Sequence, residues 1–168
     1  MKLLVIRHAL AGEREAFARS GQPDDLRPLT AGGRRKMGLA AKGLRALIPR
    51  IDMLATSPLL RAQETARIIA RAYGIDVGET TPALDPGAPM TRFTEWAAPH
   101  ASRDVVAVVG HEPHLSTLVT WLVSGLEESR VQLKKGGVCL LELEGTPRAA
   151  GAVLLWLLTP KTLRQLVP

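Results

Sequence analysis

The stretch LLVIRHA, residues 3–9, decides the fold class and indicates a site. Its four leading apolar residues predict a short strand that is buried on both faces, as in a parallel sheet. Arg7 and His8 follow at the carboxyl end of that strand. In open α/β sheets, ligands bind at the carboxyl ends of the strands. We therefore predict an α/β fold with a binding site at the tip of this strand.

Two further stretches repeat the arrangement of a short strand followed by polar residues. SPLLR, residues 57–61, follows a predicted strand over residues 52–56. GHEP, residues 110–113, follows a mostly β-branched strand over residues 104–109. Because the carboxyl ends of parallel strands share one edge of a sheet, we expect Arg61 and His111 to lie beside His8.

These tips deliver two histidines and two arginines, a set that suits phosphoryl chemistry. Histidine has an ordinary pKa of about 6.5, so it provides an unprotonated nucleophile near neutral pH. The planar fork of arginine binds phosphoryl oxygens in pairs. Arg61 and His111 also stand at predicted helix starts, where the helix dipole attracts an anion. We therefore predict that these residues hold a phosphoryl group while a histidine attacks it.

The remaining pattern alternates helices with strands. Thr30 is the predicted N-cap of a helix that ends before Pro49, and Ser57 with Pro58 is the predicted start of a helix that Gly74 ends. Further predicted elements are a short helix at 14–19, one short strand and a helix at 90–97 within segment 75–99, a helix from Pro113, strands at 138–143 and 152–158, and a helix at 161–166. This order predicts one domain over residues 1–168. Its expected form is a three-layer α/β sandwich, with a mostly parallel central sheet and helices on both faces.

The composition is that of an ordinary globular chain with excess positive charge. The 168 residues carry a net charge of +6, which favours acidic or phosphorylated partners. Aromatic residues make up 4%, the basic residues are scattered, and no nucleic-acid-binding motif is evident, so we expect no nucleic-acid partner. The sequence shows no membrane-length apolar segment and no signal peptide, and it has one cysteine, Cys139. We therefore expect a cytoplasmic protein without membrane contact, and a monomer.

Six motifs in order along the chain resemble one family. They are RHA at 7–9, DDLRPLT at 24–30, SPLLRAQETA at 57–66, GHEP at 110–113, KGGV at 135–138 and LLTP at 157–160. Together they resemble the histidine phosphatase superfamily, which includes phosphoglycerate mutases. The short chain and the second motif are most similar to its SixA-type phosphohistidine phosphatase branch. The resemblance extends over most of the chain.

The resemblance implies a fold and a mechanism. The fold would be phosphoglycerate mutase-like. His8 would be phosphorylated and the phosphoenzyme hydrolysed by water, while Arg7, Arg61 and His111 would bind the phosphoryl group. No metal or other cofactor is expected, and the four histidines and one cysteine form no clustered ligand pattern.

The general acid stays open at this point. Asp24 matches an acidic position of the SixA-type motif and is the candidate, with Glu112 and Glu95 as alternatives. We interpret Ser57 chiefly as a helix cap. His114 and His100 are expected in solvent or loops, and Cys139 is expected to be a small buried residue.

Three functions remain open from the sequence. The first is a phosphohistidine phosphatase acting on phosphorelay or phosphotransfer proteins. The second is a small-molecule phosphomonoesterase, which needs an acid to protonate the leaving alkoxide. The third, from another class, is a non-catalytic phosphate-binding regulatory module, which would keep the arginines but not the nucleophile. The presence of His8 ranks this third function low.

Overall fold

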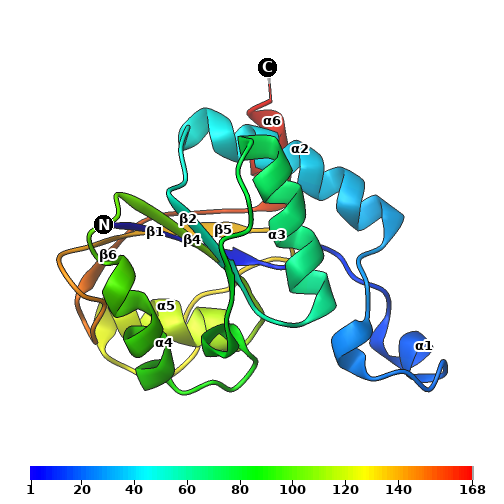
Figure 1. The fold of residues 1–168 in the computed structure, drawn as a ribbon, viewed down its shortest axis with the longest axis horizontal. Helices are drawn as coiled ribbons and strands as arrows, with labels where there is room; N and C mark the ends of the chain where they lie inside the picture. Colours follow the sequence, from blue (N-terminus) through cyan, green and yellow to red (C-terminus); the bar gives the residue numbers. More distant parts are fainter. Residues whose placement is uncertain (168) are drawn as a thin grey trace.

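The structure, a computed structural model, describes residues 1–167, and these residues build one six-stranded sheet in the order β3-β2-β4-β1-β5-β6 (Figure 1). The strands are β1 (Lys2–Arg7), β2 (Met53–Thr56), β3 (Glu79–Thr80), β4 (Val105–Gly110), β5 (Val138–Leu143) and β6 (Ala152–Leu158). Strands β3, β2, β4 and β1 are parallel neighbours, whereas β5 runs antiparallel to both β1 and β6. The predicted, mostly parallel sheet is therefore confirmed.

Helices cover both faces of this sheet, which makes the predicted three-layer sandwich. One layer contains α2 (Ala31–Leu47), α3 (Leu60–Tyr73) and α6 (Pro160–Gln165), and the other contains α4 (Met90–Ala97) and α5 (His114–Ser124). Short α1 (Arg14–Ala18) and the turn Asp24–Leu26 form a lobe beside the sheet (Figure 1).

Strand β1 shows why the first apolar stretch is continuous. Leu4 and Ile6 pack into the core beneath α2 and α3, while Leu3 and Val5 pack into the core beneath α4 and α5. All four side chains are fully buried because successive strand residues point to opposite faces.

The register of the parallel strands brings three tips together. Arg7 at the end of β1 pairs with Gly110 at the end of β4, and Thr56 of β2 pairs with Val109 of β4. The residues that follow each strand therefore emerge at one edge of the sheet. This edge carries the site described below.

Most predicted elements are confirmed, with one wrong helix start. The strands at 138–143 and 152–158 and the helix at 90–97 have the predicted bounds, and Gly74 ends α3 with a φ of 68°. However, α3 begins at Leu60 and has no side-chain cap, so Ser57 and Pro58 do not start it. The Ser57 hydroxyl is instead bonded across the site. Within residues 1–167, no helix has the length and apolarity that a membrane crossing requires.

Candidate active site

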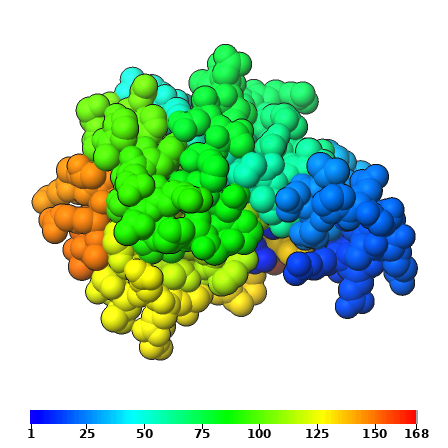
Figure 2. Space-filling view, turned by 60° about the horizontal axis from the view of Figure 1, so that its bottom comes forward, coloured from blue at the N-terminus to red at the C-terminus, as the bar shows by residue number. Residues whose placement is uncertain are grey.

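A cavity of about 600 Å³ opens at the carboxyl ends of β1, β2 and β4. Its lining includes all five residues that the sequence singled out: Arg7, His8, Asp24, Arg61 and His111. Figure 2 shows a hollow between the blue N-terminal lobe and the green and yellow body of the protein. The structure thus brings together residues from four separate segments of the chain.

His8 is held as a neutral imidazole with one nitrogen free. Its side chain is 6% exposed, and Nδ1 donates a hydrogen bond to the Ala9 carbonyl oxygen at 2.7 Å. Because a carbonyl oxygen only accepts, the proton must lie on Nδ1, which leaves the lone pair on Nε2. Burial, together with the positive charge of Arg61, lowers the pKa of His8 to about 3. His8 is therefore unprotonated at Nε2 throughout the neutral range.

His111 has the opposite tautomer. Its Nε2 lies 2.9 Å from the Ser57 hydroxyl oxygen, and that hydroxyl donates to Asp85 Oδ1 at 3.3 Å. With the hydroxyl proton assigned to Asp85, Ser57 accepts from His111 Nε2, and Nδ1 is the nitrogen without a proton in the neutral ring. Burial lowers the pKa of His111 to about 2. Its Nδ1 is buried and has no hydrogen-bond partner within residues 1–167.

The guanidinium groups of Arg7 and Arg61 are each held by a hydrogen bond from Nη1, while Nε has no partner within residues 1–167. Arg7 Nη1 donates to the Leu133 carbonyl oxygen at 2.7 Å, and Arg61 Nη1 donates to the Asp24 carbonyl oxygen at 3.0 Å. The Nε atoms of both arginines are buried and unpartnered in the part of the chain described. An anion bound between them would satisfy both of these buried N–H groups.

Asp24 contacts arginines, and these contacts oppose the role of proton donor. Its carboxylate accepts from Arg27 Nε at 2.8 Å and lies 3.3 Å from Arg61 Nη1. The hydrogen bonds from Arg27 hold the pKa of Asp24 below its usual value. Asp24 is thus a carboxylate that positions two guanidinium groups. Its sequence-based role as the acid stays a prediction without geometric support.

Of the other two acid candidates, one lies in the cavity and one does not. Glu112 lines the cavity, whereas Glu95 is exposed on α4 and is not part of the lining. Ser116 donates to Glu112 Oε2, and Oε1 is shielded from solvent without a partner among the residues described. A carboxyl group held by one oxygen in a basic cavity is suited to move a proton.

Several further residues were not anticipated from the sequence. The Arg27 guanidinium group donates both to Asp24 and, at 2.7 Å, to the Gly12 carbonyl oxygen. Asp85 accepts a hydrogen bond from the Ser57 hydroxyl. His114, expected in solvent or a loop, is only 3% exposed, because the first turn of α5 buries it near Asp85. Local pattern could not have found the contacts of Arg27 with Gly12 and of Asp85 with Ser57, since these partners come from distant segments.

Cys139 is fully buried in β5, as predicted, and burial raises the pKa of its thiol to about 12. Among residues 1–167, no group of three or more histidine, cysteine and acidic side chains is arranged to hold a metal ion.

Comparison with known sequences agrees with this geometry. A model of the histidine phosphatase superfamily (branch 1) matches residues 3–85. An uncharacterized protein of Picosynechococcus sp. is 33% identical over 143 residues, which cover 82% of each chain.

Solved structures share the whole fold. The protein histidine phosphatase SixA, complexed with tungstate, superposes with a TM-score of 0.82 at 23% identity over 97% of this chain and 99% of that chain. A putative phosphohistidine phosphatase SixA from Nakamurella multipartitia has a TM-score of 0.74 and is 26% identical, over 95% of each chain. The predicted phosphoglycerate mutase-like architecture is confirmed by these likenesses.

Proposed function

The chain belongs to branch 1 of the histidine phosphatase superfamily, and from this premise we propose that it removes the phosphoryl group from phosphohistidine on a protein of a phosphorelay or phosphotransfer system. The coarser activity, a phosphatase, follows from the family. The substrate class and the residue roles are the proposal.

The orientation of His8 is the observation that carries the proposal. A nucleophile must present a lone pair, and the bond from Nδ1 to Ala9 leaves that lone pair on Nε2. The guanidinium groups of Arg7 and Arg61 line the same cavity. A non-catalytic binding module would need the arginines but not this orientation of the histidine.

The first step transfers the phosphoryl group to His8. The Nε2 lone pair forms a bond to phosphorus as the P–N bond of the substrate breaks, and the electron pair leaves with the substrate imidazole. A phosphohistidine whose other ring nitrogen carries a proton leaves as neutral imidazole, so this step needs no acid from the enzyme. Arg7 and Arg61 stabilise the charge on the equatorial oxygens. His111 must bind a proton at Nδ1 before it can donate there, and the bound anion favours that protonation.

The second step hydrolyses the phosphoenzyme. Water attacks phosphorus, the P–N bond to His8 breaks, and the electron pair returns to Nε2. One proton of the water passes to a base, and the products are inorganic phosphate and neutral His8. Among the acidic residues that line the cavity, we assign this proton to Glu112, because its Oε1 has no partner among the residues described.

Glu112 also favours a second candidate function, the hydrolysis of small phosphate esters. An alkoxide leaving group must be protonated as it departs. Glu112 supplies a carboxyl group for that proton, whereas the carboxylate of Asp24 is engaged by Arg27 and Arg61.

The decisive experiment measures phosphate release from a histidine-phosphorylated protein in EDTA, with wild type and His8→Ala. Release by wild type that disappears in the variant supports the proposal. No release by wild type would overturn the phosphohistidine assignment. An alkyl phosphate then tests the second candidate, which predicts efficient cleavage that Glu112→Gln abolishes and Asp24→Asn only weakens.

A further inference from the structure

Positive charge is concentrated in one of the two helical layers. Helices α2, α3 and α6 together carry ten of the 22 basic residues of the chain but only one of its 16 acidic residues, Glu64. Helices α4 and α5 on the opposite face carry one basic residue, Arg92, and one acidic residue, Glu95. The excess of positive charge in the helices therefore lies in the layer of α2, α3 and α6.

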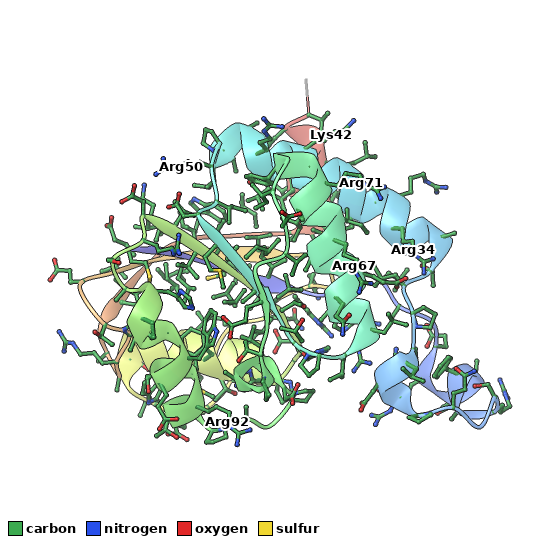
Figure 3. The ribbon with its side chains drawn as sticks, in the orientation of Figure 1. Arg34, Lys42, Arg50, Arg67, Arg71 and Arg92 are labelled. Atoms are coloured by element: carbon green, nitrogen blue, oxygen red, sulfur yellow. The ribbon has the colours of Figure 1, made fainter. Side chains whose placement is uncertain are left out.

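The exposed arginines of this layer lie over the groove between α2 and α3. A hollow of about 230 Å³ is lined by Arg34, Glu64, Arg67, Ile68 and Arg71. Figure 3 shows Arg34, Arg67, Arg71 and Lys42 distributed over α2 and α3, with Arg92 on the other side of the molecule. We call Arg34, Lys42, Arg67 and Arg71 the basic face.

Most of the charge on the basic face is uncompensated. Arg67 donates to the neutral Gln63 at 2.8 Å, and neither Arg71 nor Lys42 has an ion-pair partner within residues 1–167. Arg50, at the far end of the same layer, differs because Asp52 and Asp104 neutralise it at 2.9 and 2.7 Å. An unpaired row of cations attracts an anionic partner and is screened by salt.

Glu64 and helix α3 link the basic face to the catalytic cavity. Glu64 pairs with Arg34 at 2.6 Å, and its second carboxylate oxygen accepts from the backbone N–H of Leu29 at 2.6 Å. Leu29 follows closely on Arg27, which lines the cavity, and α3 itself carries Arg61 in its first turn. The cavity and the basic face therefore share helix α3, with Arg61 in its first turn and Arg67 and Arg71 farther along it.

We propose that the basic face docks an acidic surface of the histidine-phosphorylated protein and so selects the substrate protein. This inference rests on the proposed function. The charge favours an acidic partner, and the aromatic content favours protein over nucleic acid. The one aromatic residue of α2 and α3 is Tyr73, which is buried and bonded to the Ile48 carbonyl oxygen, so the face offers no aromatic ring for base stacking.

Two synthetic phosphohistidine peptides of equal length test the proposal. One carries an acidic flank of aspartates and glutamates, and the other carries asparagines and glutamines in the same places. The 14 residues of α3 rise about 21 Å, so an extended flank of about eight residues is long enough to follow the helix. We expect wild type to prefer the acidic peptide about three- to tenfold in kcat/KM at low salt, and to lose the preference at about 0.5 M salt.

The double variant Arg67→Gln/Arg71→Gln should lose this preference and still cleave the neutral peptide at the wild-type rate. The control Arg103→Gln/Arg148→Gln removes two charges near the opposite edge of the sheet, outside the cavity, and should keep the preference. Equal kcat/KM for the two peptides in wild type, or an unchanged preference in the double variant, would overturn the proposal.

Binding of the unphosphorylated peptides separates this inference from the proposed function. If wild type dephosphorylates neither peptide but binds the acidic one more tightly through Arg67 and Arg71, the docking surface stands and the substrate assignment fails. A single-stranded oligonucleotide of equal charge is the third probe. Tighter binding of the oligonucleotide than of the acidic peptide would replace the protein partner with nucleic acid.

Discussion

The tips of β1 and β4 each present a histidine, and the two rings lie 5.1 Å apart. Both side chains are buried, and burial lowers the pKa of both. Their hydrogen bonds differ: His8 donates from Nδ1 to the neighbouring carbonyl group of Ala9, and His111 donates from Nε2 to Ser57. The hydrogen-bond partner of each ring therefore decides which ring nitrogen carries the proton, and with it the proposed role of the histidine. The lowered pKa, which both rings share, does not distinguish them.

The hydrogen-bond partners of the two rings also differ in their distance along the chain. Ala9 is the next residue in the chain after His8, and Thr65 accepts from the Ala9 N–H at 3.0 Å. Ser57 is 54 residues away from His111 and is itself supported by Asp85. The direct partner of the His8 ring is thus its neighbour in the chain, while the direct partner of the His111 ring comes from a distant segment.

The largest predicted effect is at the β1 tip. His8→Ala removes the nucleophile, so we expect turnover to fall at least about 10³-fold and the phosphoenzyme to be absent. Rapid-quench labelling with a phosphorylated substrate measures both. The matched control His100→Ala changes a histidine outside the cavity and should retain wild-type turnover. A phosphoenzyme that persists in His8→Ala would move the nucleophile elsewhere, His111 being the first residue to examine.

The next effect is at the β4 tip. His111→Ala removes a donor to the phosphoryl oxygens but leaves the nucleophile, so we expect kcat to fall about 10²-fold. The phosphoenzyme on His8 should still form, though slowly, and mass spectrometry of the labelled peptide identifies its site. If His111→Ala loses the phosphoenzyme as completely as His8→Ala does, the proposed division into a nucleophile at the β1 tip and a donor at the β4 tip is wrong.

Removing the partner instead of the histidine gives a smaller effect. Ser57→Ala takes away the acceptor of His111 Nε2, and we expect kcat to fall about tenfold as the ring loses its orientation. Thr65→Val takes away the acceptor of the Ala9 N–H and the hydrogen bond to the Arg61 carbonyl oxygen, and the bond from His8 to Ala9 remains. We expect about a threefold loss there. Steady-state kinetics of both variants decides whether the β4 tip is the more dependent of the two, and a larger loss in Thr65→Val would reverse that order.

The smallest predicted difference between the two tips is in the pH dependence of stability, because the pKa of both histidines is lowered. The pKa of each histidine is lower in the folded protein, about 3 for His8 and about 2 for His111, than the ordinary 6.5. The unfolded chain therefore binds protons that the native state does not, and the free energy of unfolding falls as pH drops from about 6.5 toward about 3.

Each histidine contributes a slope of up to about 1.4 kcal/mol per pH unit, which His8→Gln and His111→Gln should remove equally. Urea unfolding measured from pH 7 to pH 4 tests this expectation. A flat profile in wild type would show that neither ring is held neutral.

Much of the fold and the core of the site could be predicted from short-range patterns. The continuous apolar run of β1, the helical spacing of α4 and the stop at Gly74 involve residues within a few positions of one another. The assembly of His8, His111, Arg7 and Arg61 followed from one rule, that parallel strands end at one edge.

The residues whose contacts depend on the packed fold have the opposite character. A serine before proline is a common helix cap and predicts a helix start at Ser57, but α3 begins at Leu60 and the Ser57 hydroxyl bonds His111 as well as the Leu59 N–H. Asp24 was matched by motif position, and only the fold shows that Arg27 and Arg61 hold its carboxylate. His114 was placed in solvent, and packing of α5 near Asp85 buries it.

The sequence by itself therefore determined the α/β class, the strand tips and the four residues expected to handle phosphate. The tertiary structure alone decided the tautomer of His111, the engagement of Asp24 and the availability of Glu112. Strand and helix patterns reflect burial and backbone preferences that neighbouring residues share. Hydrogen bonds between distant segments and the protonation that follows from them exist only once the strands and helices have packed.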